Sequence, residues 1–359
     1  MNPAIVHVAS GREWRGGQRQ VWLLARELAR HRIEQVVVTG EGSELAIRLR
    51  ADGVRVRAAP WRSGLDPRVV PTILAELRGR SAVLHAHDGH ALTLAGLAAA
   101  LTGTPLVVTR RVTFPLRNQF FWRRASRVIA ISGAVRAALE ASGLSPERLV
   151  LVPSAVEAPD PAAPPDGNIR ARLGLPNTGQ LAVSLGALTP EKDQFTLVET
   201  AALLVRDLPE LHWAIVGEGA LRGDLERRIA QRGLQGRFHL LGHLADPHDA
   251  LAGADVFVLS STSEGLGTSI LAAMAREVPV VATRVGGIPD VLGGGAGLMV
   301  SPGNPAELAQ AVRRILDDQD LRQELILVAR NELRRFSVSA VAERVLTVYR
   351  SCAHSLDGS

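Results

Sequence analysis

The segment that most constrains the fold is residues 255–291, which reads as a strand, a loop, a helix and a second strand. Residues 256–259 and 278–283 are short apolar runs rich in valine, and helix-forming residues around 269–275 lie between them. A helical crossover returns the chain to the same end of a sheet, so the two strands must run parallel. The segment therefore predicts a βαβ unit within a parallel α/β sheet.

The loop that precedes this helix, residues 260–268, consists mainly of serine, threonine and glycine. Small residues let backbone N–H groups at a helix N-terminus approach an anion, and the helix dipole favours negative charge there. An ordinary tight turn between a strand and a helix has the same composition. From the loop alone, an anion site and a turn that binds nothing both remain open.

Strands and helices alternate along the whole chain, which predicts two doubly wound α/β domains of Rossmann-like type. At 359 residues the chain is long enough for two domains, each with its own core. The expected strands of the first half are residues 5–9, 36–39, 54–56, 82–86, 106–109, 127–132 and 149–153, and the expected helices are 18–30, 44–52, 69–77, 91–101 and 133–142. Those of the second half are strands 180–186, 211–216, 237–241, 256–259, 278–283 and 296–300, with helices 193–204, 221–232, 247–252, 305–316, 320–333 and 338–352.

A break in composition separates the two halves. Residues 157–167 contain four prolines in eleven residues, which exclude a helix or a central strand. We therefore expect an N-terminal domain over residues 1–157, a proline-rich linker over 158–168 and a C-terminal domain over 169–336, followed by a last helix at 337–353.

The cysteine count and the apolar segments indicate the cellular compartment of the protein. Cys352 is the only cysteine, which excludes an internal disulfide and a site with several cysteine ligands, and suits the reducing cytoplasm. The first nine residues read as a strand rather than a signal peptide, and no apolar run reaches the length of a membrane-spanning helix. We expect a cytoplasmic protein.

The net charge of +5 favours anionic partners. Lys192 is the only lysine among 41 basic residues, and the arginines are dispersed along a chain with 4% aromatic residues and no nucleic-acid-binding motif. The sequence therefore ranks a peripheral contact with an anionic membrane or glycolipid above nucleic acid.

Polar groups follow three strands of the first half. Gly16 and Gly17 lie between the first strand and first helix, where paired glycines permit close approach to a diphosphate, although the dinucleotide fingerprint is absent. The fourth strand ends in His85-Ala86-His87-Asp88-Gly89-His90, with His90 expected in a turn. This group favours hydrogen bonding to a polar substrate over a metal, because no further ligand pattern completes the set; a solvated turn stays open.

Arginines end the fifth strand. Arg110 and Arg111 follow Thr109 at the same edge of the sheet, and arginine is suited to bidentate phosphate or carboxylate binding.

The second half repeats this arrangement. Lys192 follows the first strand of this half, where its ammonium could meet a diphosphate, and Gly217-Glu218-Gly219 follows the second strand. Glu264 and the amides after it complete the set.

Taken together, these segments resemble the retaining family-4-type glycosyltransferases of the GT-B fold, especially those of bacterial envelope polysaccharide and lipopolysaccharide core. The resemblance is carried by Gly16-Gly17, His85-Ala86-His87 and residues 128–139, 183–204, 214–226, 238–275 and 278–292. It implies two Rossmann-like domains that face a cleft, a last helix that returns to the first domain, a nucleotide diphosphate sugar donor, a glycan or glycolipid acceptor, and neither a cofactor nor a metal ion.

The resemblance also implies roles for individual residues. His87 matches the family's histidine near the reaction centre, Lys192 the lysine on the donor diphosphate, and Glu264 the first acid of the family's E-x7-E signature. These three are the expected catalytic residues. The expected donor-binding residues are Gly16, Gly17, Arg110, Arg111, Gly217, Glu218, Gly265, Leu266, Gly267 and Thr268.

Two positions depart from the family pattern. Ala272 replaces the second acid of the signature, which binds ribose in the family, and Ala187 replaces an arginine. We hypothesise that Arg110 or Arg111 replaces the missing positive charge. These departures leave open a non-catalytic sugar-nucleotide-binding relative. A second rival is a nucleotide-sugar epimerase of GT-B fold, which would need cleft carboxylates for acid/base work, where only Glu264 is well placed.

Overall fold

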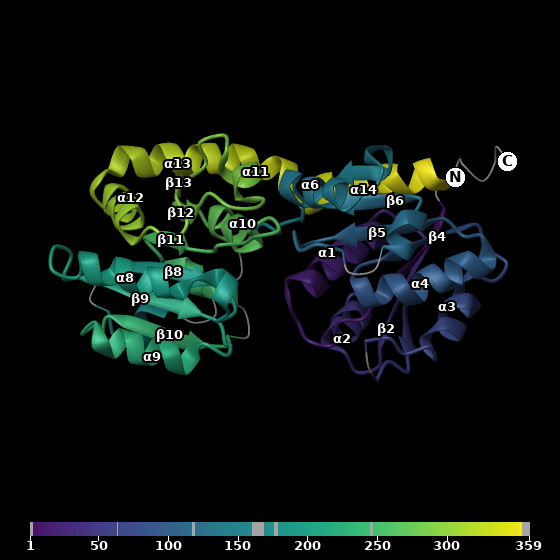
Figure 1. The fold of residues 1–359 in the computed structure, drawn as a ribbon, viewed down its shortest axis with the longest axis horizontal. Coiled ribbons are helices and arrows are strands. Elements are labelled where there is room, and N and C mark those ends of the chain that lie inside the picture. The colour runs from purple at the N-terminus through teal and green to yellow at the C-terminus, as the bar shows by residue number, and fades with distance from the viewer. Residues whose placement is uncertain are drawn as a thin grey trace. The chain divides into compact units, whose positions relative to one another are not determined.

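The computed structural model describes residues 3–62, 64–116, 119–159, 169–175, 179–244 and 247–353. Internal contacts divide the chain into unit 1, Met1–Ala155 with Phe336–Ser359, and unit 2, Val156–Arg335. Each unit is a parallel sheet packed between helices (Figure 1). Residues 160–168 of the expected linker lie outside the described residues.

Unit 1 contains a sheet of seven strands in the order β3-β2-β1-β4-β5-β6-β7. All its paired strands are parallel. The strands are β1 (Ala4–Ala9), β2 (Gln35–Gly40), β3 (Val56–Ala59), β4 (Ala82–Ala86), β5 (Leu106–Arg110), β6 (Arg127–Ala130) and β7 (Leu149–Leu151). The helices are α1 (Gly16–Arg30), α2 (Glu44–Ala51), α3 (Val69–Leu77), α4 (Gly89–Thr102), α5 (Phe120–Arg124), α6 (Gly133–Ala141), the short η1 (Pro146–Arg148) and α14 (Val338–Ala353).

Unit 2 contains a sheet of six parallel strands in the order β10-β9-β8-β11-β12-β13. The strands are β8 (Gln180–Leu185), β9 (Leu211–Val216), β10 (Phe238–Gly242), β11 (Val256–Leu259), β12 (Val280–Thr283) and β13 (Leu298–Val300). The helices are α7 (Ile169–Arg172), η2 (Pro190–Lys192), α8 (Gln194–Leu204), α9 (Arg222–Gln231), η3 (Pro247–Gly253), α10 (Thr268–Ala275), α11 (Ile288–Leu292), α12 (Pro305–Asp317), α13 (Gln319–Glu332) and η4 (Leu333–Phe336). The segment 255–291 forms the predicted βαβ unit, β11-α10-β12.

The strand order determines where a ligand can bind in each unit. In unit 1 the order reverses between β1 and β4, and in unit 2 it reverses between β8 and β11. Helices that leave two such strands go to opposite faces of the sheet, so a crevice opens at the strands' carboxyl ends. Each unit therefore has one topological switch point, and residues that follow these four strands are the first candidates for a site.

The last helix of the chain, α14, belongs to unit 1 and confirms the expected return of that helix to the first domain. Its apolar residues Val341, Val345 and Val348 follow helical spacing and pack with Leu28 of α1 and Ile129 of β6 in one buried cluster. The helix therefore helps to form the core of unit 1.

Three short α-helices of the described residues were not predicted, because each is too short to show a helical period. These are α5, α7 and α11, of four or five residues each. The third strand begins at Val56 rather than Val54. The expectation that His90 lies in a turn is wrong, because the side chain of Asp88 accepts a hydrogen bond from the Ala91 amide and starts α4 at Gly89. No helix among the described residues combines the length and the apolar character needed to cross a membrane.

Candidate active site

The structure brings Lys192 and Glu264 together at the switch point of unit 2. Lys192 ends η2, which follows β8, and Glu264 lies in the loop that follows β11, the strand next to β8. The Lys192 Nζ atom lies 2.6 Å from Glu264 Oε1, and the two side chains are only 22% and 10% exposed. The Ser261 hydroxyl donates to the same carboxylate oxygen over 2.8 Å. A cation and a carboxylate 72 residues apart in sequence thus form one polar centre.

The two loops that carry this pair are fastened to each other. The Ser260 hydroxyl lies 3.0 Å from the carbonyl oxygen of Lys192 and 2.8 Å from that of Asp193, and the Thr262 amide donates to the carbonyl of Glu191. Asp193 adopts a left-handed backbone with φ of 46° and its side chain caps α8. These bonds hold the backbone of both loops in place, as a preorganised site requires.

A glycine that the sequence did not single out makes room for Glu264. Gly286 has a φ of +53°, and a Cβ atom there would lie 1.8 Å from the carbonyl oxygen of Glu264. The next amide, that of Gly287, donates to this oxygen over 3.2 Å. Only glycine allows this approach, so the loop after β12 supports the Glu264 backbone.

The loop between Glu264 and α10 leads into the N-terminus of α10, where no side chain of the described residues caps the backbone amides. Gly267 has a φ of +85°, and no side chain caps the helix that begins at Thr268. The amides of Gly265 through Thr268 are therefore the groups that could serve an anion, whereas the side chain of Leu266 is buried in the core.

Three other positions of unit 2 that the sequence singled out are Gly217, Glu218 and Ala272. Glu218 forms an exposed ion pair with Arg222 over 2.8 Å. Gly217 permits a close backbone approach, because a Cβ atom there would lie 1.9 Å from the carbonyl oxygen of Gly186. Ala272 is buried on α10, so the position of the missing second acid carries no polar group.

Unit 1 has a cluster of three buried histidines at its own switch point. His7 on β1 pairs in register with His85 on β4, and His87 follows β4 directly. His7 Nδ1 lies 2.9 Å from His87 Nε2. His85 Nδ1 lies 2.6 Å from the hydroxyl of Tyr349 on α14, and His85 Nε2 lies 2.8 Å from the hydroxyl of Thr109.

Burial keeps these histidines neutral. It lowers the pKa of His7 to about 4, and it holds the pKa of His85 and of His87 well below the ordinary value, with a further contribution from the neighbouring histidines and Arg111. A neutral imidazole carries one N–H donor and one acceptor. The Nδ1 atom of His87 is buried without a hydrogen-bond partner among the described residues and can therefore serve a ligand.

The three histidines are close enough to be considered as metal ligands. One nitrogen of each lies within 4.8 Å of one nitrogen of the others. Both nitrogens of His85, however, already have partners in Tyr349 and Thr109, and the positive charge of Arg111 acts on the group. The geometry favours a hydrogen-bonding role over metal ligation, and the absence of a metal ion remains a prediction.

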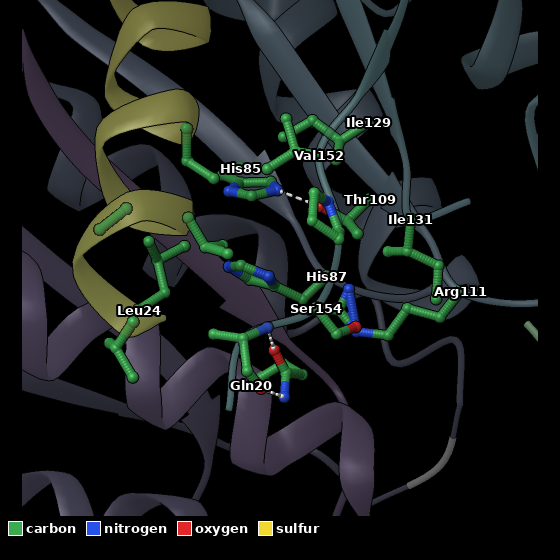
Figure 2. A pocket seen from close by; sticks show the side chains of 16 residues that line it. Gln20, Leu24, His85, His87, Thr109, Arg111, Ile129, Ile131, Val152 and Ser154 are labelled. Carbon is green, nitrogen blue, oxygen red and sulfur yellow. Dashed lines mark hydrogen bonds between the residues drawn. The ribbon is translucent and has the colours of Figure 1, made fainter. Parts of the chain in front are cut away.

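A pocket of unit 1 opens onto His85 and His87 (Figure 2). His85, His87, Thr109, Arg111 and Ser154 line it on one side. Its apolar wall comes from α1, from β6 and the residue after it, from the segment after β7 and from α14. It consists of Leu24, Ile129, Ile131, Val152, Val338, Val341, Ala342 and Val345. A pocket with one apolar wall and a few convergent polar groups suits a small polar ligand.

The structure separates the two arginines that the sequence treated as equivalent. Arg110 donates to the backbone carbonyls of Val112 and Phe114, and its guanidinium lies 5.5 Å from the ring centroid of Trp122. Arg111 instead lines the pocket, with its Nε atom buried and unpartnered among the described residues.

Gly16 and Gly17 are the first two residues of α1, which begins two residues before the predicted start at Gln18. No side chain caps this helix, and a Cβ atom on Gly17 would lie 4.0 Å from Arg111 Cδ. The paired glycines therefore place uncapped backbone amides beside Arg111.

Known proteins are similar to this chain in sequence and in fold. Residues 14–158 match the family described as Glycosyltransferase Family 4, and residues 166–332 match that described as Glycosyl transferases group 1. The chain is 31% identical over 350 residues to the 2-deoxystreptamine glucosyltransferase of Streptomyces kanamyceticus, which covers 84% of this chain and 89% of the relative.

Two further comparisons are informative. The lipopolysaccharide core biosynthesis glycosyltransferase LpsE of Rhizobium meliloti is 33% identical over 184 residues, or 51% of this chain and 53% of LpsE. The crystal structure of Anabaena HepE in complex with UDP and glucose superposes with a TM-score of 0.83 at 21% identity, over 97% of this chain and 100% of HepE. The matched regions, the full-length relative and the fold together show that the chain belongs to glycosyltransferase family 4 and is a glycosyltransferase of the GT-B fold.

Proposed function

We propose that this enzyme moves a hexose or heptose from a nucleotide diphosphate sugar to a lipid-linked or polysaccharide acceptor of the cell envelope, with retention of the anomeric configuration. The observation that carries the proposal is the Lys192–Glu264 pair at the switch point of unit 2. HepE, which has the same fold, holds UDP and glucose, and LpsE acts in lipopolysaccharide core biosynthesis.

On the donor side, Lys192 would contact the diphosphate and Glu264 would accept hydrogen bonds from hydroxyls of the donor sugar. Negative charge develops on the diphosphate as the bond to the sugar breaks, and a fixed ammonium stabilises that charge more than it stabilises the bound donor. The amides of residues 265–268 would add donors at the uncapped start of α10. In the absence of donor the carboxylate keeps Lys192 in position, because the two atoms are 2.6 Å apart.

The chemistry would be a front-face displacement. The acceptor hydroxyl attacks the anomeric carbon from the side on which the diphosphate departs, and its proton leaves with a phosphate oxygen. This route needs no enzymatic nucleophile, and it produces retention because the new bond forms on the face of the old one. His87 would contribute its free Nδ1 atom near the reaction centre.

A second class of acceptor is favoured by one observation. The relative matched over 89% of its length is named a 2-deoxystreptamine glucosyltransferase, so a small aminocyclitol is the alternative to an envelope glycan. Neither a nucleotide-sugar epimerase nor a non-catalytic relative is favoured by the matched proteins, which are named as transferases.

Incubation of the whole chain with a panel of nucleotide sugars tests the proposal. Each donor is supplied with either envelope glycolipids or 2-deoxystreptamine, and free nucleoside diphosphate and glycosylated product are measured together. Transfer to the glycolipid supports the proposal, and transfer to 2-deoxystreptamine alone would replace the acceptor class. Sugar inversion without nucleotide release would identify an epimerase, and donor binding without turnover would identify a non-catalytic relative. The Lys192→Ala variant serves as the negative control.

A further inference from the structure

Arg111 is a positive charge for which the described part of unit 1 provides no counter-ion. Its Nε atom is buried without a partner, and burial lowers the pKa of the Arg111 guanidinium to about 10, so that it remains charged at neutral pH. The acid that acts on it, Asp88, is already engaged: its carboxylate accepts hydrogen bonds from the amide and hydroxyl of Ser10 and from the Ala91 amide.

The Arg111 side chain is only partly exposed, and its Nε atom is buried without a partner among the described residues. A charge that is partly removed from water destabilises a fold unless it is paired. Arg110, one residue away, shows the ordinary solution, because its guanidinium donates to two backbone carbonyls. The unpaired state of Arg111 thus has a physical explanation if a ligand supplies the negative charge.

A second, independent group points into the same pocket. His87 is 5% exposed, and its Nδ1 atom has no partner among the described residues. Arg111 and His87 line the pocket together, and Figure 2 shows both side chains at its polar side beside Ser154. Gln20 exchanges two hydrogen bonds with the backbone of Ala155, which fixes the segment that carries Ser154.

We infer that unit 1 contains its own oxyanion site, in which Arg111 and His87 bind a phosphate or carboxylate group of a substrate. A guanidinium provides paired N–H donors that match the oxygens of such a group, and the imidazole adds a further donor. The site itself rests on unit 1 alone, whereas the assignment of its ligand to a substrate rests on the proposed function.

The site also gives His7 a positioning role. For His87 to donate from Nδ1, its Nε2 atom must be the acceptor, and the atom 2.9 Å away is His7 Nδ1. His7 must then carry its proton on Nδ1. His7 therefore holds His87 in the tautomer that can donate to an anion.

Two sources could supply the oxyanion: the diphosphate of the donor, or an anionic substituent of the acceptor. Gly17, at the start of α1, lies beside Arg111, and the helix has no side-chain cap among the described residues, so the amides at its start would serve either source. Both sources share one chemistry, and competition between inorganic phosphate and UDP distinguishes them.

The test uses the whole chain and measures binding of inorganic phosphate and of UDP by calorimetry. Arg111→Gln is expected to weaken phosphate binding at least about tenfold, the loss typical of one charge-assisted contact. Arg136→Gln is the matched control, because it removes an equal charge from unit 1 at an exposed ion pair with Glu140. The melting temperature of Arg111→Gln should equal or exceed that of the wild type, since the substitution removes a partly buried charge whose Nε atom has no partner among the described residues. This separates loss of binding from loss of folding.

Each outcome has a defined meaning. If phosphate binds equally well with UDP bound, the site serves the acceptor. If UDP displaces phosphate and Arg111→Gln weakens both, the site serves the donor. Equal phosphate affinity in the wild type and Arg111→Gln, or no phosphate binding by the wild type, would overturn the inference. Phosphate binding without turnover of any nucleotide sugar would retain the oxyanion site and reject the proposed function.

Discussion

Acidification should selectively weaken unit 1 through its buried histidines. The pKa of His7 falls to about 4 because the side chain is buried, so the folded state binds no proton at this residue near neutral pH. The unfolded chain protonates the same histidine below its ordinary value of about 6.5. The free energy of unfolding is therefore highest above about pH 6.5. It decreases as the pH falls from about 6.5 toward 4, because the unfolded chain binds a proton that the folded chain does not.

The size of the effect follows from these two values. Between pH 7 and pH 5, His7 alone should remove about 2 kcal/mol of the free energy of unfolding. His85 and His87 act in the same direction, because burial lowers their pKa values as well. The loss of about 2 kcal/mol from His7 alone is between about an eighth and two fifths of the 5–15 kcal/mol that is typical of a folded domain.

Urea unfolding at pH 7 and pH 5, followed by tryptophan fluorescence, measures this loss. Four of the five tryptophans, Trp14, Trp22, Trp61 and Trp122, lie in unit 1, so the signal reports mainly on that unit. Replacing His7 with phenylalanine should reduce the acid-induced loss by about 2 kcal/mol, since the titrating group is gone. His31→Gln, at an exposed position after α1, should behave as the wild type. A unit 1 that is equally stable at both pH values, or an identical loss in the wild type and His7→Phe, would refute the reasoning.

Three further predictions concern the donor site and its support. Lys192→Ala removes the group proposed to stabilise the leaving diphosphate, and Glu264→Gln removes the carboxylate proposed to bind the donor sugar. Each should lower kcat/KM for the donor at least about 100-fold, and steady-state kinetics would show this. In chemical denaturation, Gly286→Ala should destabilise unit 2 more than Gly295→Ala. Both glycines have positive φ, but only at Gly286 would the added Cβ atom lie 1.8 Å from a backbone oxygen. Equal losses of stability would contradict this prediction. Arg110→Ala should lower the stability of unit 1 by about 1–2 kcal/mol through two lost hydrogen bonds, and an unchanged urea midpoint would count against it.

The sequence predicted most of the fold because strand and helix periods are local properties. The alternation of short apolar runs with amphipathic helices predicted both sheets, and the segment 255–291 formed the expected βαβ unit. Elements of four or five residues, such as α5 and α11, escaped prediction because they have no period to read. The start of α4 at Gly89 depended on a side-chain cap from Asp88.

The site was predictable only where a residue type carried its own signal. Lys192 and Glu264 stood out as the only lysine and as an acid in a glycine-rich loop, yet their contact across 72 residues required the adjacency of β8 and β11. His7 and Tyr349 were missed, because a histidine within an apolar strand and a tyrosine within an apolar helix read as ordinary core residues. Their roles depend on the register of β1 with β4 and on the packing of α14.

The difference between Arg110 and Arg111 was likewise invisible in sequence. Adjacent residues at the end of a strand point to opposite sides, so one guanidinium reaches the following loop and the other reaches the pocket. The sequence shows two adjacent positive charges, but it does not show which of the two arginines lacks a partner.

The measurement that tests the central claim most directly is the anomeric configuration of the product formed from an α-linked nucleotide sugar. The donor that the enzyme turns over is incubated with its acceptor. The proton NMR spectrum of the isolated product is recorded, and the amount of nucleoside diphosphate released is measured in the same reaction. The account predicts an α-linked product in equal amount to the nucleotide, formed by the wild type and largely absent with Lys192→Ala. A β-linked product, or equal turnover by Lys192→Ala, would contradict it.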